Sequence, residues 1–596
     1  MFKFKLSYLV FASALASPCA FADPFSYNHP SGTNVIDIEA PNAAGVSHNK
    51  YREFNVSDKG TVLNNSTENV SHSSLGNIAK NYNLTSGKAA TVILNEVISN
   101  NASALKGFIE VNGQKADVII ANPNGISCSG CKFINTDKAI LTTGTVTLSD
   151  TGAISTSTVS GGTISVDQKG MSAPDSYAVL LANAINLNGV VEAKNAIISA
   201  GNFTFNNATG AITSAGNSSQ QNGAEYGIDI TSLGGVKANN ITMVGNNLGF
   251  GVRNKGAVVA NASLAMTSYG TLINEGTINS NGYMMQMVSA GDFSNSGTIA
   301  TNNVAVINSQ GTLTNTGNIT NTAQMAIGSI GNMHNTGTIA GTNLVTVNTN
   351  GNLTTTYGSM LKSNNQLAVT ALGNIDNGGS IRANNNIVSF GGDTLKVTGN
   401  LYGYDSALVR AYKNEALTSG EITNSGTIAG NNVTIATNGT LATTSGSLLK
   451  GENTVTTSSY WLNNRGSIRV GDNGNMLLNN IVLTNDNAYI VGGKNITINS
   501  YLDMLNTGTI QSFGDLTIDT QNNGIITNRN YIVAKGTMTL NARQVVNGGY
   551  RCGFLNLATC GRGSLSANKL ILNSSHKNAS SMGGTQKFNS TVVNVR

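Results

Sequence analysis

The residues with the clearest capacity for chemistry are the cysteines. Apart from Cys19, they form two closely spaced pairs, Cys128 with Cys131 and Cys552 with Cys560. Such pairs form disulfides in an oxidising compartment, whereas a C-x-x-C is half of a zinc site when a second pair or histidines lie nearby. The histidines show no ligand spacing, so both pairs are disulfide candidates, and neither a metal site nor a cofactor is predicted. The scattered histidines are His29, His48, His72, His334 and His576.

Acidic side chains give no sign of a catalytic centre. The 596 residues include 29 aspartates and glutamates, and acids such as Asp292 and Asp376 occur singly at turn positions. A polysaccharide lyase would need clustered carboxylates to hold calcium, together with a basic residue. The sequence also lacks H-E-x-x-H, G-x-S-x-G, a Walker A loop and an EF-hand loop. These patterns favour a protein that is not an enzyme.

The composition restricts the elements that position these residues. Charged residues make up 11% of the chain, less than half the usual share of about 25%. A chain so poor in Lys, Glu and Arg lacks the side chains that usually cover helix surfaces. A hydrophobic content of 40% argues against disorder. Because abundant Asn, Thr, Ser and Gly suit strands and turns, we predict an all-β fold.

The middle of the chain repeats itself with a period of about twenty residues. In a typical unit, 311–330, Leu313 and Ile319 flank an Asn-x-Gly turn and a third apolar strand follows. Periods of about 20 to 50 residues indicate solenoids, and proline, which central strands exclude, is absent after Pro174. The pattern predicts a parallel β-helix in which each unit is one coil. The units begin at Gly270, Gly291, Gly311, Gly331, Gly351 and Gly373.

Asparagine has a specific use in such a fold. A single coil buries too little apolar surface to fold alone, so each coil must be stabilised by its neighbours. Asn at equivalent positions of successive coils can stack in amide ladders, as in cross-β arrays. We therefore expect ladders of Asn side chains along the rod.

The first 22 residues read as a secretory signal peptide. Two lysines form a positive n-region, Leu6–Ala16 is an apolar h-region, and Ala20-Phe21-Ala22 is an A-x-A cleavage site. Cleavage is expected before Asp23, after export by the Sec machinery; an uncleaved anchor helix is the alternative. No other segment reaches the roughly 18 apolar residues of a membrane span. The mature chain is therefore expected to be exported and soluble.

The N-terminal third carries motifs of a known family. They include a block at 45–66 and a block at 95–144 that contains ANPNGI (121–126) and CSGCKFINT (128–136). These blocks resemble the secretion domain of filamentous haemagglutinin and haemolysin-type exoproteins, which travel by two-partner secretion (TPS). The resemblance implies a right-handed parallel β-helix that engages POTRA domains of a dedicated outer-membrane barrel. The C-x-x-C variant looks more like the haemolysin branch.

The segment Asn122-Pro123-Asn124-Gly125 also has a plain structural interpretation. Pro presets φ at the second position of a turn, and Gly accepts a positive φ. The motif is therefore predicted to join two strands. The resemblance adds a secretion role, which would act through folding or through contact with the partner.

These patterns divide the chain into four parts. They are a signal peptide (1–22), a TPS secretion domain (23–270) whose stretch from Asp23 to about Gly60 caps the open end, a repeat β-helix (271–545) and a basic end (546–596). From residue 520 onward the chain has nine Lys and Arg and no acid. This end is either a solvated cap or a tether to an anionic surface. Without interleaved aromatic residues it predicts no nucleic-acid partner.

Three functions remain open at this point. The favoured one is an adhesin or haemagglutinin-like rod, secreted or held at the surface of a Gram-negative bacterium after passage through the periplasm. Its expected partners are the outer-membrane transporter, the Sec machinery and a receptor on host or bacterial cells. The alternatives are a cytolysin of the same secretion family and a truncated contact-dependent inhibition stem that lacks its toxin domain.

Overall fold

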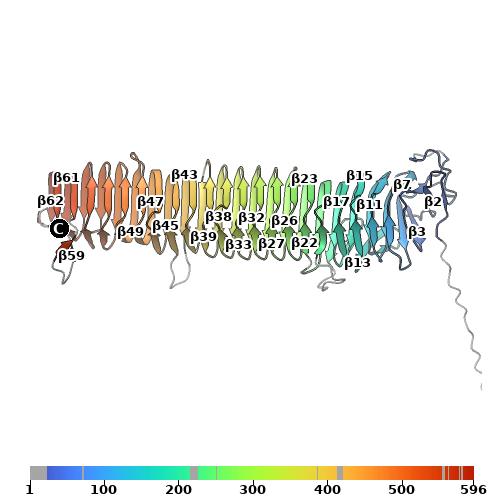
Figure 1. The fold of residues 1–596 in the computed structure, drawn as a ribbon, viewed down its shortest axis with the longest axis horizontal. Helices are drawn as coiled ribbons and strands as arrows, with labels where there is room; N and C mark the ends of the chain where they lie inside the picture. Colours follow the sequence, from blue (N-terminus) through green and yellow to red (C-terminus); the bar gives the residue numbers. More distant parts are fainter. Residues whose placement is uncertain are drawn as a thin grey trace, which may run out of the picture.

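The computed structural model is a long rod of stacked strands (Figure 1). One sheet system joins 56 strands, and nearly all its pairings are parallel, whereas no α-helix occurs in the described part of the chain. The predicted all-β parallel solenoid is therefore confirmed. The structure describes residues 23–69, 73–214, 226–249, 251–385, 387–412, 420–548, 550–552, 558–560, 563–575, 577–578 and 582–595.

Each coil of the repeat region has three strands joined by tight turns. In one coil these are β30 (Leu313–Asn315), β31 (Asn318–Asn321) and β32 (Gln324–Ser329). Each strand pairs in parallel with its counterpart in the coil before and the coil after, as the repeat predicted. The counterparts are β27 (Phe293–Asn295), β28 (Thr298–Thr301), β29 (Val304–Ser309), β33 (Met333–Asn335), β34 (Thr338–Gly341) and β35 (Leu344–Thr349).

Apolar side chains at equivalent positions stack into one continuous core. Leu272, Phe293, Leu313 and Met333 are in register on successive coils and are fully buried. The same core cluster extends from Ile36 to Met582. Because alternate residues of each strand point inward, the period-two pattern of the sequence directly builds this core.

A short hairpin covers the N-terminal edge of the solenoid. Strand β1 (Ser26–Asn28) pairs antiparallel with β2 (Asn34–Asp37), and β2 pairs in parallel with β4 (Thr61–Asn65). The antiparallel strand therefore occupies the edge at which another coil would otherwise add. The cap is shorter than the predicted stretch to Gly60, because β3 (Val46–Tyr51) already pairs in parallel with β5 (Val92–Val97).

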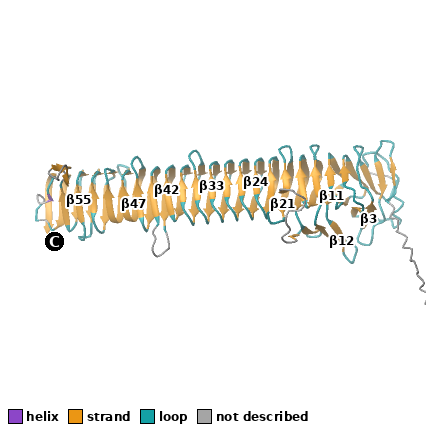
Figure 2. Cartoon of the chain, turned by 60° about the horizontal axis from the view of Figure 1, so that its bottom comes forward, coloured by secondary structure: helices purple, strands orange, loops and turns teal. Residues whose placement is uncertain are grey.

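A four-stranded antiparallel sheet lies against one side of the N-terminal coils, beside the rod in Figure 2. Its side chains Phe203 and Phe205 pack on a second apolar cluster that includes Leu94, Ile119 and Val179 on outward faces of the solenoid. The repeat pattern did not predict this sheet, because its hairpins are insertions between solenoid strands. Its strands are β12 (Thr145–Leu148), β13 (Ile154–Val159), β18 (Phe203–Asn206) and β19 (Ile212–Ser214).

The C-terminal coils end in two long parallel strands, β61 (Ser564–Ser574) and β62 (Thr585–Val595). Nearby, β59 (Tyr550–Cys552) and β60 (Ala558–Cys560) form an antiparallel pair. The side chains of these two cysteines lie outside the described part, so their disulfide stays a prediction. The signal-peptide residues, including Ala20 and Ala22, also lie outside it.

Candidate functional site

The N-P-N-G motif is a turn between β8 (Ala116–Ala121) and β9 (Ile126–Cys128). The buried Asn122 side chain donates from Nδ2 to the Asn101 carbonyl and to Ser103 Oγ, both at 2.9 Å. Its backbone N–H donates to the Thr142 carbonyl at 2.9 Å. Asn101 and Ser103 precede Asn122 by about one coil and Thr142 follows by one, so one asparagine joins three successive coils.

The remaining motif residues form the tip of this turn. Asn124 donates from its backbone N–H to Asn122 Oδ1 at 3.0 Å and from Nδ2 to the Ser99 carbonyl at 2.7 Å. Gly125 has φ of 111°, and a Cβ there would lie 3.1 Å from the Thr163 carbonyl oxygen. Pro123 and Asn124 are the exposed members of the motif. A partner can therefore reach the tip, while Asn122 and Gly125 serve the turn itself.

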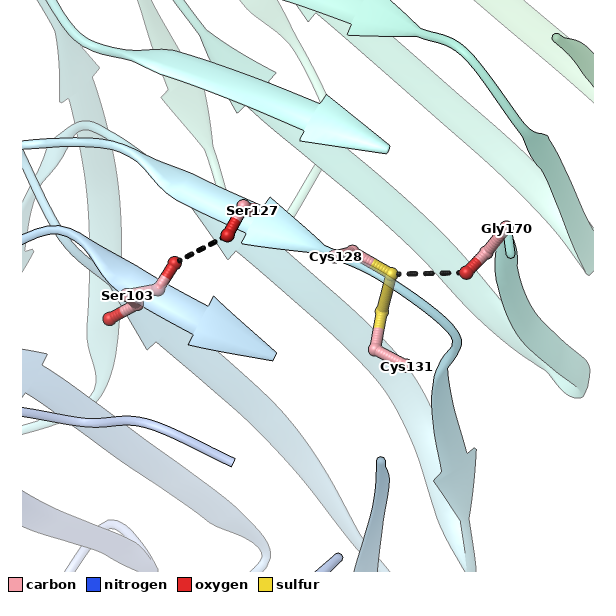
Figure 3. The surroundings of a disulfide bond; sticks show 5 residues. All are labelled: Ser103, Ser127, Cys128, Cys131 and Gly170. Atoms are coloured by element: carbon pink, nitrogen blue, oxygen red, sulfur yellow. Dashed lines mark hydrogen bonds between the residues drawn. A yellow bond between two sulfur atoms is a disulfide. The ribbon is translucent and has the colours of Figure 1, made fainter. Parts of the chain in front are cut away.

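A disulfide joins Cys128 to Cys131, the first candidate pair (Figure 3). Cys128 ends β9 and Cys131 begins β10 (Cys131–Ile134), so the bond spans a corner between consecutive strands. Both residues are fully buried, and Cys128 Sγ lies 3.4 Å from the Gly170 carbonyl oxygen of the next coil. The bonded sulfurs hold the corner and leave no thiolate pair for zinc.

Cys128 belongs to a line of inward-facing residues at one corner of the rod, which we call the corner column. Its members are paired in register from coil to coil, and its composition changes along the rod. The N-terminal members are Val56, Leu105, Cys128, Val166, Leu187 and Ile230. The next members are Asn254, Asn274, Asn295, Asn315 and Asn335.

The asparagines of the corner column form the amide ladders that the composition predicted. From Asn254 to Asn335, each Nδ2 donates to the Oδ1 of the next asparagine at 2.8 Å. A second ladder from Asn464 to Asn547 has the same bonds at 2.7–2.8 Å. The coils between the ladders carry Thr355, Asn377, Val397, Asn424 and Thr443 in this column.

Ionisable side chains join the first coils of the N-terminal region. His48 Nε2 on β3 donates to Glu96 Oε2 on β5 at 2.7 Å. This hydrogen bond holds the pKa of Glu96 below its usual value, although partial burial opposes the shift. On β8, burial raises the pKa of Asp117 despite the ammonium of Lys138 at 3.8 Å. These groups couple the stability of the first coils to pH.

The N-terminal loops also enclose an open cavity of about 840 Å³ beside the cap. Loop residues from 41–45, 65–68, 86–91 and 113–114 line it, with Glu68 and Lys88 as its charged side chains. No group of three or more His, Cys, Asp or Glu side chains within the described ranges is arranged to hold a metal ion. None of the described residues forms a helix long and apolar enough to span a membrane.

Sequence reasoning singled out Asn122 but missed its partners Asn101 and Ser103. The signal that would have found them is the coil period, since residues about twenty positions apart lie side by side in a solenoid. The period also places Leu105 beside Cys128, 23 residues later, but not Val166, which lies 38 residues after Cys128 because β12 and β13 intervene. The contacts of Asn122 show that the motif is hydrogen-bonded to the coils on both sides of it.

Comparison with known proteins identifies similarity over the region that holds these features. A family model described as the TPS secretion domain matches residues 26–280. The chain is 39% identical over 227 residues to the tRNA nuclease CdiA of Yersinia mollaretii, which is 37% of this chain and 7% of that protein. It is 34% identical over 252 residues to the 16S rRNA endonuclease CdiA of Enterobacter cloacae, which is 42% of this chain and 7% of that protein.

A solved structure of a filamentous hemagglutinin secretion domain is also similar. It shows 30% identity and a TM-score of 0.40, and the match covers 51% of this chain and 98% of that one. The chain spans less than a tenth of the length of the two CdiA relatives. The matched family range contains the N-P-N-G turn, the Cys128–Cys131 disulfide and the His48–Glu96 pair.

Proposed function

Because this chain belongs to the exoproteins of two-partner secretion, we propose that it leaves the cell through a dedicated outer-membrane transporter whose POTRA domains bind residues of the N-terminal domain. A TPS domain implies such a transporter as partner, and exoproteins of this family are secreted or displayed by Gram-negative bacteria. The route begins in the periplasm after Sec-dependent export. The observation that carries this proposal is the TPS match over 26–280 together with the cap and turn that it contains.

The N-P-N-G motif assists export mainly through folding. Asn122 fastens its coil to the preceding and following coils by buried hydrogen bonds, so it stabilises an early block on which later coils can stack. Each added coil finds a ready strand edge, because all its neighbours in the repeat pair in parallel and in register. Folding outside the cell then pulls the chain forward without ATP.

Outside the cell the rod acts as an adhesin. Successive coils place outward-facing side chains in straight columns with a spacing of about 4.8 Å, which suits repeated contacts with an extended or multivalent target. The proposed role involves no catalysis by this chain. The nuclease activities named for the CdiA relatives belong to those proteins.

A second candidate is the stem of a contact-dependent inhibition protein. It is favoured by the CdiA toxins among the relatives, at 34–39% identity. In that role the rod would carry a toxin-bearing segment toward a target cell. The two candidates share the export route and differ in what the rod presents.

Secretion in a heterologous host tests the export route. The chain would be produced with and without a cognate transporter, and its release would be measured by blotting the medium. We expect release only with the transporter, a large loss for Asn122→Ala and a small loss for the exposed-tip variant Asn124→Ala. Release without the transporter would overturn the route, and a larger loss for Asn124→Ala would show that contact with the tip dominates.

The same medium tests the role of the rod. We expect it to agglutinate erythrocytes or to bind cultured cells without lysing them. Lysis of the cells would instead indicate that the protein is a cytolysin and not an adhesin. Growth inhibition of neighbouring bacteria by producing cells, without binding to host cells, would favour the inhibition stem.

A further inference from the structure

On one outward face of the solenoid, the size and charge of the side chains change halfway along the rod. On β25 (Thr277–Ser280), β28, β31 and β34, its outward residues are small or neutral, for example Thr277, Ala300 and Ala340. Further along, large and basic side chains join small ones such as Ser380, Thr427 and Ser467 in the same two columns. The large and basic residues are Met360, Lys362, Arg382, Tyr402, Leu448, Lys450, Arg469 and Tyr489.

These residues lie on strands that stack side by side in the yellow-to-orange part of Figure 1. Lys362 is in register with Arg382, Arg382 with Tyr402, and Lys450 with Arg469. The Arg382 guanidinium lies over the Tyr402 ring, 5.5 Å from its centroid. The strands are β37 (Met360–Ser363), β40 (Ser380–Ala383), β43 (Asn400–Ala411), β47 (Leu448–Asn464), β48 (Ser467–Val470) and β50 (Tyr489–Gly492). Between β43 and β47, β45 (Thr427–Thr437) contributes only the small residues Thr427 and Ala429 to these columns.

A groove runs along the edge of this face, parallel to the rod. It consists of two cavities of about 390 and 550 Å³ that both reach Gly446. The groove extends from Tyr357, which is 97% exposed, to Tyr489, which is 51% exposed. Its ends are about six coils apart, so its length is about 30 Å at the usual strand spacing.

Glycines contribute bare backbone to the smaller cavity of the groove. Gly378, Gly379, Gly399 and Gly426 line it at successive turns. A Cβ on Gly399 would lie 2.0 Å from the Gly379 carbonyl oxygen, and one on Gly426 would lie 2.1 Å from the Gly399 carbonyl oxygen. Because stacking requires glycine at these turns, this cavity stays open to a ring or sugar that lies against it.

Three cations enter the larger cavity, and none of the residues lining it is acidic. Arg465 Nε lies 3.1 Å from Asp486 Oδ2, and Lys450 Nζ lies 2.5 Å from Glu452 Oε1. Arg469 Nε donates to Ser467 Oγ at 2.8 Å. These contacts hold the cations in place, while each guanidinium carries further N–H donors that suit a planar anionic group.

We propose that this groove binds a linear polysaccharide that carries carboxylate or sulfate groups. Arg465, Arg469 and Lys450 bind its anionic groups, Tyr489 and Tyr357 stack on sugar rings, and the exposed side chains of Ser445 and Asn487 hydrogen-bond its hydroxyls. A single-stranded nucleic acid fits less well, because it needs aromatic rings under successive bases and the rings here lie at the two ends of the groove. The inference deepens the adhesin role proposed above and rests on it.

Binding of fluorescent oligosaccharides to the purified, folded chain tests this groove independently of secretion. The probes are alginate fragments for carboxylate, heparin fragments for sulfate, dextran as the neutral control and an oligodeoxynucleotide. We expect at least one acidic probe to bind with an affinity that falls as salt rises, and dextran not to bind. Arg465→Gln with Arg469→Gln is expected to weaken that binding at least tenfold, and Tyr489→Ala at least threefold.

The control is Lys494→Gln, which removes an exposed cation on a neighbouring coil outside the groove. It is expected to change affinity less than twofold. Circular dichroism melts would verify that all variants are folded. The proposal is overturned if no acidic polysaccharide binds, if the double variant binds as well as Lys494→Gln, or if the oligodeoxynucleotide binds more tightly than either polysaccharide. Failure of this assay with normal secretion would leave the export route standing.

Discussion

The corner column has two different constructions in one continuous rod. In the N-terminal domain it consists of aliphatic residues such as Leu187 and Ile230 and of a disulfide at Cys128. In the repeat region the same line of positions carries asparagines such as Asn295 and Asn315, which bond to one another at 2.8 Å. The pairing passes from Ile230 to Asn254 without a break.

The difference shows two ways to hold a coil corner. Aliphatic residues stabilise it by burial and tolerate coils of unequal length, which the N-terminal domain needs because hairpins and a side sheet interrupt it. A buried amide is stable only when its donors and acceptors are satisfied. An inward-facing asparagine is therefore best satisfied by a polar neighbour at the equivalent position of the next coil, and a run of asparagines favours coils of equal length in register.

Exchanging the residue types of the corner column, with asparagine placed in the aliphatic part and leucine in the asparagine ladder, should give the largest effect on stability. Leu187→Asn places an unpaired amide between Val166 and Ile230. Asn315→Leu removes the shortest acceptor of Asn295 Nδ2 and the Nδ2 donor to Asn335 Oδ1. Each should cost about 3–5 kcal/mol through lost burial or unsatisfied buried groups. Urea denaturation followed by circular dichroism, with hydrogen exchange around each site, measures the loss.

A matched control is available where the ladder is interrupted. Val397 lies in the corner column between Asn377 and Asn424, so Val397→Asn introduces an amide that has amide neighbours on both sides. Its stability should stay within about 1 kcal/mol of the parent, since new hydrogen bonds offset the lost apolar burial. Equal losses for Val397→Asn and Leu187→Asn would show that neighbouring amides do not govern the column.

Removing the disulfide should give the next largest effect. Cys128→Ala with Cys131→Ala deletes the covalent corner, and the chain-entropy model assigns about 2 kcal/mol to a loop this short. Hydrogen exchange should rise in the N-terminal coils and stay unchanged in the ladder around Asn315. Uniform loosening along the whole rod would contradict the idea that the two constructions are stabilised separately.

The repeat region was predictable because its period is visible in the sequence. A glycine every twenty or so residues, an Asn-x-Gly turn and alternating apolar positions specify three strands, and a rod follows from stacking them. The amide ladders were predictable for the same reason, since equal coils bring equal residues together. Which asparagines face inward could be read from their place between a buried strand and a turn glycine.

The N-terminal domain was less predictable from residue patterns alone. Phe203 and Phe205 alternate like core residues, but they face a side sheet that packs on the outside of the solenoid. The period places Asn101, Ser103 and Thr142 beside Asn122, because they lie 19 to 21 residues away, but it does not show which of their atoms bond to it. The exposed groove needed the structure, because the repeat pattern pairs Lys450 with Arg469 but does not show that these side chains and Arg465 line a common cavity.

The smallest predicted effect is on the pH dependence of stability, which should differ between the N-terminal coils and the repeat region. The hydrogen bond from His48 lowers the pKa of Glu96 in the folded chain. The pair therefore stabilises the fold above the ordinary glutamate pKa of about 4.3 and loses this contribution as pH falls through the lowered folded value. Glu96→Gln should be less stable than the parent at pH 7, and the difference should begin to shrink near the ordinary glutamate pKa of about 4.3 and vanish only once pH falls below the lowered folded pKa.

The matched control for that variant is Glu275→Gln, which alters an exposed pair with Lys255 at 3.4 Å near the start of the ladder. Exposed ion pairs contribute little, so the control should change stability less than Glu96→Gln at every pH. The amide ladder has no proton to gain or lose in this range, whereas the first coils do. The measurement is a series of thermal melts from pH 3 to 8. If the acid-induced loss of stability arose in the repeat coils, the contrast between acid-sensitive first coils and a pH-insensitive ladder would be refuted, because the acid-sensitive contacts then could not be those around Glu96.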